Sequence, residues 1–319
     1  MFKKFIPLVA VMAITTACTG GGKSNADLAS NPFVNPAETY MASPDFNSIK
    51  IEHYLPAFEE GIRQHEAEID SIANNPEPAT FENTLVALEK SGRVLSRVSS
   101  VFFALTSADT NDELIAIEEE ISPKLSAHSD ALYLNDKLFE RVKAIHDGDL
   151  SSLEPEDQRL VKHYYDNFVQ AGALLSSEDK EQLKTLNQKE AALLTDFGNK
   201  LTKATNAFIF IKDKTQLAGL SEEQLKSASD LAEKEGHNGE YAFSLVNTTQ
   251  QDIMVNLDVR ETRKLFYDAS IKRCIKGDEY DTQKIVLELA KVRADKAKLL
   301  GLPNYAAWKL QDQLAAKPE

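Results

Sequence analysis

The sequence predicts a mainly α-helical protein that contains one small β element. From Phe46 onward, apolar residues recur every three to four positions, which is the spacing of one face of an α-helix. The period changes to two only near 241–247, and the apolar run at 207–211 is a plausible partner strand. Hydrophobic residues make up 42% of the 319 positions and charged residues 27%, which is the composition of a globular protein rather than a disordered one.

The first 18 residues have the layout of a bacterial export signal. Lys3 and Lys4 precede an apolar run over 5–17, which is too short to cross a bilayer and remain there. Small residues then lead to Cys18. This arrangement resembles a lipoprotein signal in which Cys18 becomes the acylated amino terminus, although Thr15 stands where such signals usually have Leu. Ordinary cleavage with an incidental Cys18 is the alternative.

This amino-terminal pattern predicts three parts of the chain and a location. Residues 1–18 form the signal peptide, residues 19–44 form a flexible tether rich in Gly, Ser, Asn and Pro, and residues 45–319 form the helical region. We therefore expect an exported protein that is lipid-anchored in the bacterial cell envelope, either facing the periplasm or on the outer membrane.

The net charge argues against nucleic-acid binding, and the cysteines argue against a catalytic thiol. The formal net charge of −14 opposes binding to nucleic acid, because a nucleic-acid partner requires clustered Lys and Arg to neutralise its phosphates. The second of the two cysteines, Cys274, has no intramolecular disulfide partner if Cys18 carries lipid. No His or acidic residue lies next to Cys274 in sequence, so we assign it no catalytic role.

The first half of the helical region shows clear helix signals. Thr110 and Glu113 have the spacing of a capping box, Pro123 falls inside the helix that follows, and Asn135 is placed to cap the next one. Ahead of them, one apolar stripe runs through Leu85, Leu88, Leu95, Val98, Phe102 and Leu105.

The second half continues this pattern around the β element. A long helix is predicted through Leu183–Leu201, Ser221 and Gln224 form a second capping box, and Gly236 ends the helix that they begin. Further helices are predicted near Gln250, Glu261 and Asp281, and Asn304 caps a last one. No fixed-period repeat is present, so a solenoid of identical units is not supported.

The histidines do not form a recognisable metal motif. A helical zinc site needs two His one turn apart with a Glu between them, and the closest of the six histidines are twelve positions apart. We expect His65 to be an exposed helix residue, His128 a satisfied core residue, and His53 a capping or packing residue. No G-x-S-x-G elbow is present either, so the residues alone predict no catalytic and no metal-binding site.

Three stretches taken together resemble a known family. Residues 49–114, 120–145 and 292–319, the last reading VRADKAKLLGLPNYAAWKLQDQLAAKPE, resemble the amino-terminal half of the bacterial peptidyl-dipeptidases. These enzymes form the dipeptidyl carboxypeptidase branch of the thimet oligopeptidase (M3) family of zinc metallopeptidases. The resemblance covers residues 31–319 and lies in the order of the segments, since none of them is a catalytic motif.

The resemblance implies a mostly helical amino-terminal lobe of a two-lobed peptidase, which removes dipeptides from the carboxyl ends of oligopeptides. In this family, the H-E-x-x-H zinc motif comes after the segment that corresponds to residues 314–319. We therefore expect a carboxyl-terminal catalytic half as a missing partner. We expect zinc in the full-length enzyme but none in this fragment, and no activity from the fragment alone.

Two other interpretations remain open from the sequence. The chain could be a non-catalytic helical peptide-binding lipoprotein that descends from such a peptidase. Alternatively, a separate chain could supply the catalytic half. Whether a zinc-binding half follows residue 319 distinguishes the main interpretation from both of these.

Overall fold

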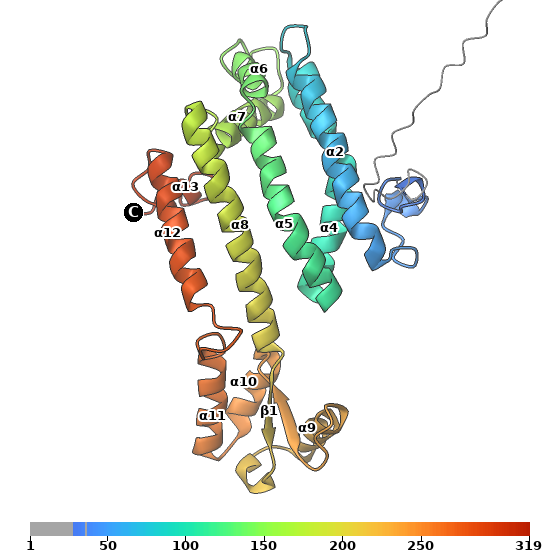
Figure 1. The fold of residues 1–319 in the computed structure, drawn as a ribbon, viewed down its shortest axis with the longest axis vertical. Coiled ribbons are helices and arrows are strands. Elements are labelled where there is room, and N and C mark those ends of the chain that lie inside the picture. Colours follow the sequence, from blue (N-terminus) through green and yellow to red (C-terminus); the bar gives the residue numbers. More distant parts are fainter. Residues whose placement is uncertain (1–27, 36) are drawn as a thin grey trace, which may run out of the picture.

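The fold is mainly helical, as predicted, in a computed structural model that describes residues 28–35 and 37–319. Five helices pack side by side along the molecule, and neighbours contact each other in the order α4, α2, α5, α8, α12 (Figure 1). They are α2 (Tyr54–Ala73), α4 (Arg93–Ala108), α5 (Asp112–Tyr133), α8 (Ser177–Thr205) and α12 (Gln283–Leu299).

Shorter elements connect and cover these helices. The elements that precede α8 are η1 (Tyr40–Ala42), η2 (Ile51–His53), the π-helical turn η3 (Phe81–Val86), α3 (Ala87–Lys90), α6 (Asp136–His146) and α7 (Pro155–Ala171). Those that follow α8 are β1 (Phe208–Ile211), η4 (Lys214–Leu217), α9 (Glu222–Lys234), β2 (Tyr241–Ser244), α10 (Asn247–Asn256), α11 (Arg260–Ile271) and α13 (Tyr305–Lys309).

Most of the predicted helix caps are confirmed. The Asn135 side chain accepts a hydrogen bond from Leu138 N, and Ser221 and Gln224 form the predicted box at the start of α9. The box predicted at Thr110 and Glu113 is wrong, because Asn111 is the residue with extended backbone, and its Oδ1 accepts from Leu114 N at 2.9 Å. The cap therefore lies one residue later than the sequence pattern indicated.

The apolar stripe predicted from Leu85 to Leu105 is divided between two cores. Gly92 adopts a left-handed conformation with φ of 65°, and this turn separates α3 from α4. Leu85 and Leu88 consequently pack in a core with α6 and α7, whereas Val98 packs in a second core against the start of α2.

The small β element lies at the far end of α8 and forms a separate α/β unit with α9, α10 and α11 (Figure 1). β1 and β2 pair antiparallel, with Phe208 opposite Ser244 and Ile211 opposite Tyr241. The predicted second strand, 241–247, is too long because α10 begins at Asn247. The helices predicted near Gln250, Glu261 and Asp281 are confirmed as α10, α11 and α12.

The packed part of the chain begins before residue 45. Phe33, which falls in the predicted tether at 19–44, is 1% exposed and lies 5.1 Å from the ring of Tyr54. The Arg97 guanidinium also donates to the backbone oxygen of Phe33. Cys18 lies outside the described residues. Within the part of the chain that the structure describes, no helix combines the length and apolar character needed to cross a bilayer.

Gly219 provides a test of the packing in the α/β unit. Its φ is +97°, and an added Cβ would lie 2.2 Å from the backbone oxygen of Asn256. We predict that Gly219→Ala lowers the free energy of unfolding by about 2 kcal/mol more than Gly236→Ala, since the added methyl must push two backbone segments apart. Gly236 is the matched control, because it also has positive φ but would meet no atom within 4 Å. Urea unfolding followed by circular dichroism measures both, and equal costs would contradict the packing described.

Candidate functional site

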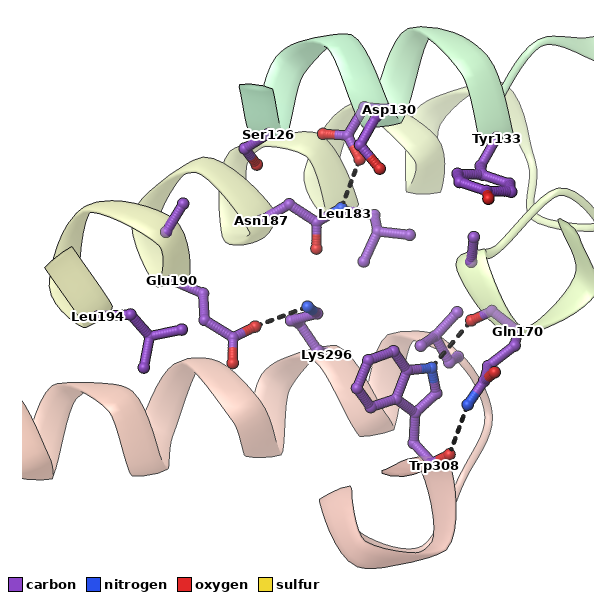
Figure 2. Close-up of a pocket in the computed structure, with 14 residues that line it drawn as sticks. Ser126, Asp130, Tyr133, Gln170, Leu183, Asn187, Glu190, Leu194, Lys296 and Trp308 are labelled. Atoms are coloured by element: carbon purple, nitrogen blue, oxygen red, sulfur yellow. Dashed lines mark hydrogen bonds and ion pairs between the residues drawn. The ribbon is translucent and has the colours of Figure 1, made fainter. Parts of the chain in front are cut away.

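A cavity of about 320 Å³ lies where α5, α7, α8, α12 and α13 meet. Figure 2 shows Asp130 and Asn187 pointing toward each other on one side of this cavity and Glu190 pointing toward Lys296 on another. The cavity is lined by both acidic and basic side chains together with Tyr133 and Trp308. It therefore combines charge and aromatic surface, which is typical of a small-molecule site.

A buried ion cluster forms one wall and joins α8 to α12. The Glu190 carboxylate accepts from Arg293 Nε at 2.8 Å and from Lys296 Nζ at 2.7 Å. Burial acts to raise the pKa of Glu190, but the hydrogen bonds from Arg293 and Lys296 outweigh it and hold this pKa below its usual value. Glu190 is therefore ionised at neutral pH despite being only 7% exposed.

The Lys296 ammonium also contacts the aromatic end of the cavity. Its Nζ lies 5.0 Å from the ring centroid of Trp308, at cation–π distance. Trp308 Nε1 donates to the backbone oxygen of Gln170 at 2.9 Å, and Gln170 Nε2 donates to the backbone oxygen of Trp308 at 3.0 Å. These reciprocal bonds hold α13 against α7 and so close the cavity from that side (Figure 2).

Asp130, on α5, has one unsatisfied oxygen at this cavity. Its Oδ1 accepts from Asn187 Nδ2 at 2.6 Å, whereas Oδ2 is buried and has no hydrogen-bond partner among the described residues. Burial raises the pKa of Asp130, opposed by the Asn187 hydrogen bond and by the charge of Lys296. A buried carboxylate oxygen without a partner is energetically costly, so this is the least satisfied polar group of the cavity.

The structure brings together two histidines that are 63 positions apart. His65 Nδ1 lies 2.9 Å from His128 Nε2, and His65 Nε2 lies 3.1 Å from Ser91 Oγ. The prediction that His65 is exposed is wrong: its side chain is half-buried, because the His128 ring of α5 and the turn at Gly92 lie against it. His128 is buried, as predicted for a core residue, but its Nδ1 lacks a hydrogen-bond partner within the described ranges and lies 3.7 Å from Glu66 Oε1.

Burial favours neutral rings in this pair. Burial lowers the pKa of both His65 and His128, and the charge of His128 lowers that of His65 further. Since Ser91 Oγ donates to Leu88 O at 2.7 Å, it accepts a hydrogen bond from His65 Nε2–H, and His65 Nδ1 accepts one from His128 Nε2–H. The pair thus acts as a structural link between α2 and α5.

The other residues weighed from the sequence have structural roles. His53 Nδ1 accepts from Lys50 N at 3.1 Å, which confirms a capping role. Cys274 is a half-buried free cysteine, and burial raises the pKa of its thiol. A raised thiol pKa lowers the thiolate fraction and with it nucleophilic reactivity.

The described residues do not fit a zinc ion. Within residues 28–35 and 37–319, no three His, Cys, Asp or Glu side chains gather closely enough to hold a metal ion. Because catalytic zinc takes three protein ligands, no zinc-dependent step is assigned to these residues.

Two charged residues on apolar helix faces were a sign of this cavity in the sequence, which the apolar spacing alone did not reveal. Glu190 lies on the apolar stripe of the long helix α8, and Lys296 lies one turn after Val292 on that of α12. A charged residue on a buried stripe requires a buried partner, so these two positions indicated a pair. Which residues would pair depended on the docking of α8 on α12.

Comparison with known proteins identifies the family. The sequence model of Peptidase family M3 matches residues 253–319 of this chain. The dipeptidyl carboxypeptidase of Salmonella typhimurium is 45% identical over 294 residues, and that of Escherichia coli is 42% identical over 291 residues. The chain belongs to peptidase family M3. The peptidyl-dipeptidase branch fits best among the relatives compared, since oligopeptidase A of Salmonella typhimurium is 26% identical over 291 residues.

This M3 chain aligns with only part of each relative. The region matched to the Salmonella dipeptidyl carboxypeptidase covers 92% of the chain and 43% of that protein. The region matched to the Escherichia coli protein covers 91% of the chain and 43% of that protein. For oligopeptidase A, the shares are 89% and 43%. The chain therefore spans somewhat less than half the length of the curated relatives that it matches.

We predict that the Glu190 cluster contributes strongly to stability. Glu190→Gln lowers the free energy of unfolding by about 3 kcal/mol at pH 7, because the buried Lys296 and the half-buried Arg293 lose their shared counter-charge. Glu288→Gln is the matched control: Glu288 pairs with Lys189 at 3.0 Å between the same two helices, but both side chains are about half exposed, so this change costs less than about 1 kcal/mol.

The Glu190 contribution also depends on pH. A carboxyl whose folded-state pKa is depressed contributes stability above its unfolded pKa of about 4.3 and loses that contribution as the pH falls through the folded pKa. The difference between wild type and Glu190→Gln should therefore shrink in acid. A difference that is small at pH 7, or constant down to pH 2, would contradict the role of this cluster.

The histidine pair predicts a second pH effect. The pKa values of His65 and His128 are lower in the folded protein than in the unfolded chain. As the pH falls through about 6.5, the unfolded chain therefore takes up protons before the folded protein does, and the free energy of unfolding decreases from pH 7.5 to pH 5.5. Replacing both residues with Gln flattens this slope, whereas His163→Gln, at an exposed position, leaves it unchanged. Chemical unfolding across this pH range measures the slope, and an unaltered slope in the double variant would contradict the prediction.

Proposed function

We propose that this chain is the amino-terminal region of a zinc-dependent peptidyl-dipeptidase, which releases dipeptides from the carboxyl termini of oligopeptides. The observation that carries the proposal is the identity of 45% and 42% to two dipeptidyl carboxypeptidases over nine-tenths of the chain. The share of 43% of those proteins supports a function in which these residues are one part of a longer enzyme.

In this proposal, the described helices form a wall that confines oligopeptide substrates, and a carboxyl-terminal half supplies the zinc ligands. The five packed helices suit this role, because buried ion pairs and cores hold them in one arrangement. A site built on rigid helices positions a substrate more accurately than a site built on loops does.

Reading the coding DNA beyond codon 319 tests the proposal. An open frame that continues into a His-Glu-x-x-His sequence supports the peptidyl-dipeptidase function, since that motif places two imidazoles and a general base on one helix face. A frame that continues without any such motif would overturn it, and the peptide-binding lipoprotein would then be the better interpretation.

We predict that the isolated 319-residue chain binds less than one-tenth of an equivalent of zinc and releases no dipeptides. The reason is that the described residues lack a three-ligand cluster. Elemental analysis after dialysis measures the metal, and mass spectrometry of a peptide incubated with the chain detects dipeptides. Stoichiometric zinc, or shortening of the peptide by two residues, would contradict the assignment of catalysis to the other half.

We further propose that Cys18 carries a lipid that anchors the protein in the bacterial cell envelope. Support comes from Lys3 and Lys4, the apolar run over 5–17 and the small residues before Cys18. Cys18→Ser should abolish incorporation of labelled palmitate and shift the protein from the membrane to the soluble fraction. Cys274→Ser is the control and should leave both unchanged; equal labelling of the Cys18 variant would refute the anchor.

A further inference from the structure

The cavity between α5, α8, α12 and α13 contains a carboxylate, that of Asp130, which forms no ion pair among the described residues. Asp130 is 7% exposed, and its Oδ2 has no partner among the residues that the structure describes. Asn187 already donates to the other oxygen, Oδ1. A buried carboxylate in this situation is stabilised by any cationic donor that can enter the cavity.

The cavity does not supply that donor from its own wall. Lys296, the basic residue of the lining, is held by Glu190 at 2.7 Å and lies over the ring of Trp308. Glu190 is shared by two cations, Arg293 and Lys296, whereas Asp130 is the lining carboxylate that has no ion-pair partner of its own among the described residues. This arrangement favours a positively charged ligand over an anion.

The shape and surface of the cavity narrow the class of ligand. Its volume of about 320 Å³ is at the small end of ligand pockets, so it suits a compact molecule rather than a long peptide. The aromatic rings of Tyr133 and Trp308 lie at one end of the cavity, where they can contact an alkyl or cationic group (Figure 2). A metal ion is a poorer fit, since no third His, Cys, Asp or Glu within the described ranges joins Asp130 and Glu190.

We propose that this cavity binds the primary ammonium group of a small molecule, which pairs with the negative charge of the Asp130 carboxylate in the cavity wall. The group can come from the α-amino end of a free amino acid or dipeptide, or from a simple alkylamine. These sources share the ammonium and differ in whether a carboxylate accompanies it. Binding at this cavity is independent of the proposed peptidase activity, because it uses only residues of this chain.

The single tryptophan of the sequence makes this proposal directly measurable. Trp308 lines the cavity, so its fluorescence reports on occupancy without a label. The purified 319-residue chain is titrated at pH 7.5 with L-leucine, leucyl-glycine, n-butylamine and N-acetyl-L-leucine. We expect a saturable change with ligands that carry a free amine and none with N-acetyl-L-leucine, which lacks the ammonium.

The pattern among the amines distinguishes the sources. Binding of L-leucine and leucyl-glycine without n-butylamine assigns the site to amino termini, and equal binding of n-butylamine assigns it to amines in general. Both results support the proposal. Binding of N-acetyl-L-leucine as tight as that of L-leucine, or no saturable change with any amine, would overturn it, because water alone would then satisfy Asp130.

The variant Asp130→Asn tests whether the charge of Asp130 is needed to bind the amine. It keeps the shape of the side chain but removes the charge, and we expect at least tenfold weaker binding of the amine ligands. Asp295→Asn is the matched control, since it removes the same charge from an exposed position next to Lys296, and binding should stay within twofold of wild type. The melting temperature of the unliganded Asp130→Asn protein should equal or exceed that of wild type, which separates lost recognition from lost folding. Unchanged affinity in this variant would overturn the assignment.

Discussion

The burial of the Glu190 carboxylate between two cations is the constraint on which the arrangement of the last helices depends. Arg293 and Lys296 reach Glu190 across 103 and 106 positions, after the chain has left α8, built the α/β unit and returned as α12. A carboxylate removed from water costs several kcal/mol unless its partners are well placed, so α12 is held in the register that supplies both. That register also places Lys296 over Trp308, and hence α13 against α7, which completes the cavity.

Much of the fold could be predicted from local chemistry, because helices and their caps are encoded over a few residues. The caps at Asn135 and at Ser221 with Gln224, and the pairing of 208–211 with the following strand, are of this kind. The wrong predictions concern positions where two neighbouring residues could both act as a helix cap, or where contacts with residues distant in sequence determine the structure. Asn111 displaced Thr110 as a cap, Gly92 divided an apolar stripe, and Phe33 joined a core formed by residues far along the chain.

The candidate site was less predictable, since none of its key pairs is local in sequence. Asp130 meets Asn187 across 57 positions, and His65 meets His128 across 63. Acidic and basic residues on helices are usually solvated, so their burial becomes visible only when the helices are packed. Membership of the family, by contrast, was predictable from the order of whole segments, and the identities to dipeptidyl carboxypeptidases confirm it.

The most direct test of the proposed function is to digest a defined peptide with the complete product of this gene and to identify the fragments by mass spectrometry. An oligopeptide with a blocked amino terminus suits this purpose, because only its carboxyl end is then free. The account predicts a ladder that shortens by two residues at a time from the carboxyl end and that stops when zinc is chelated. Cleavage at the amino-terminal end, removal of single residues, or an intact peptide would contradict it.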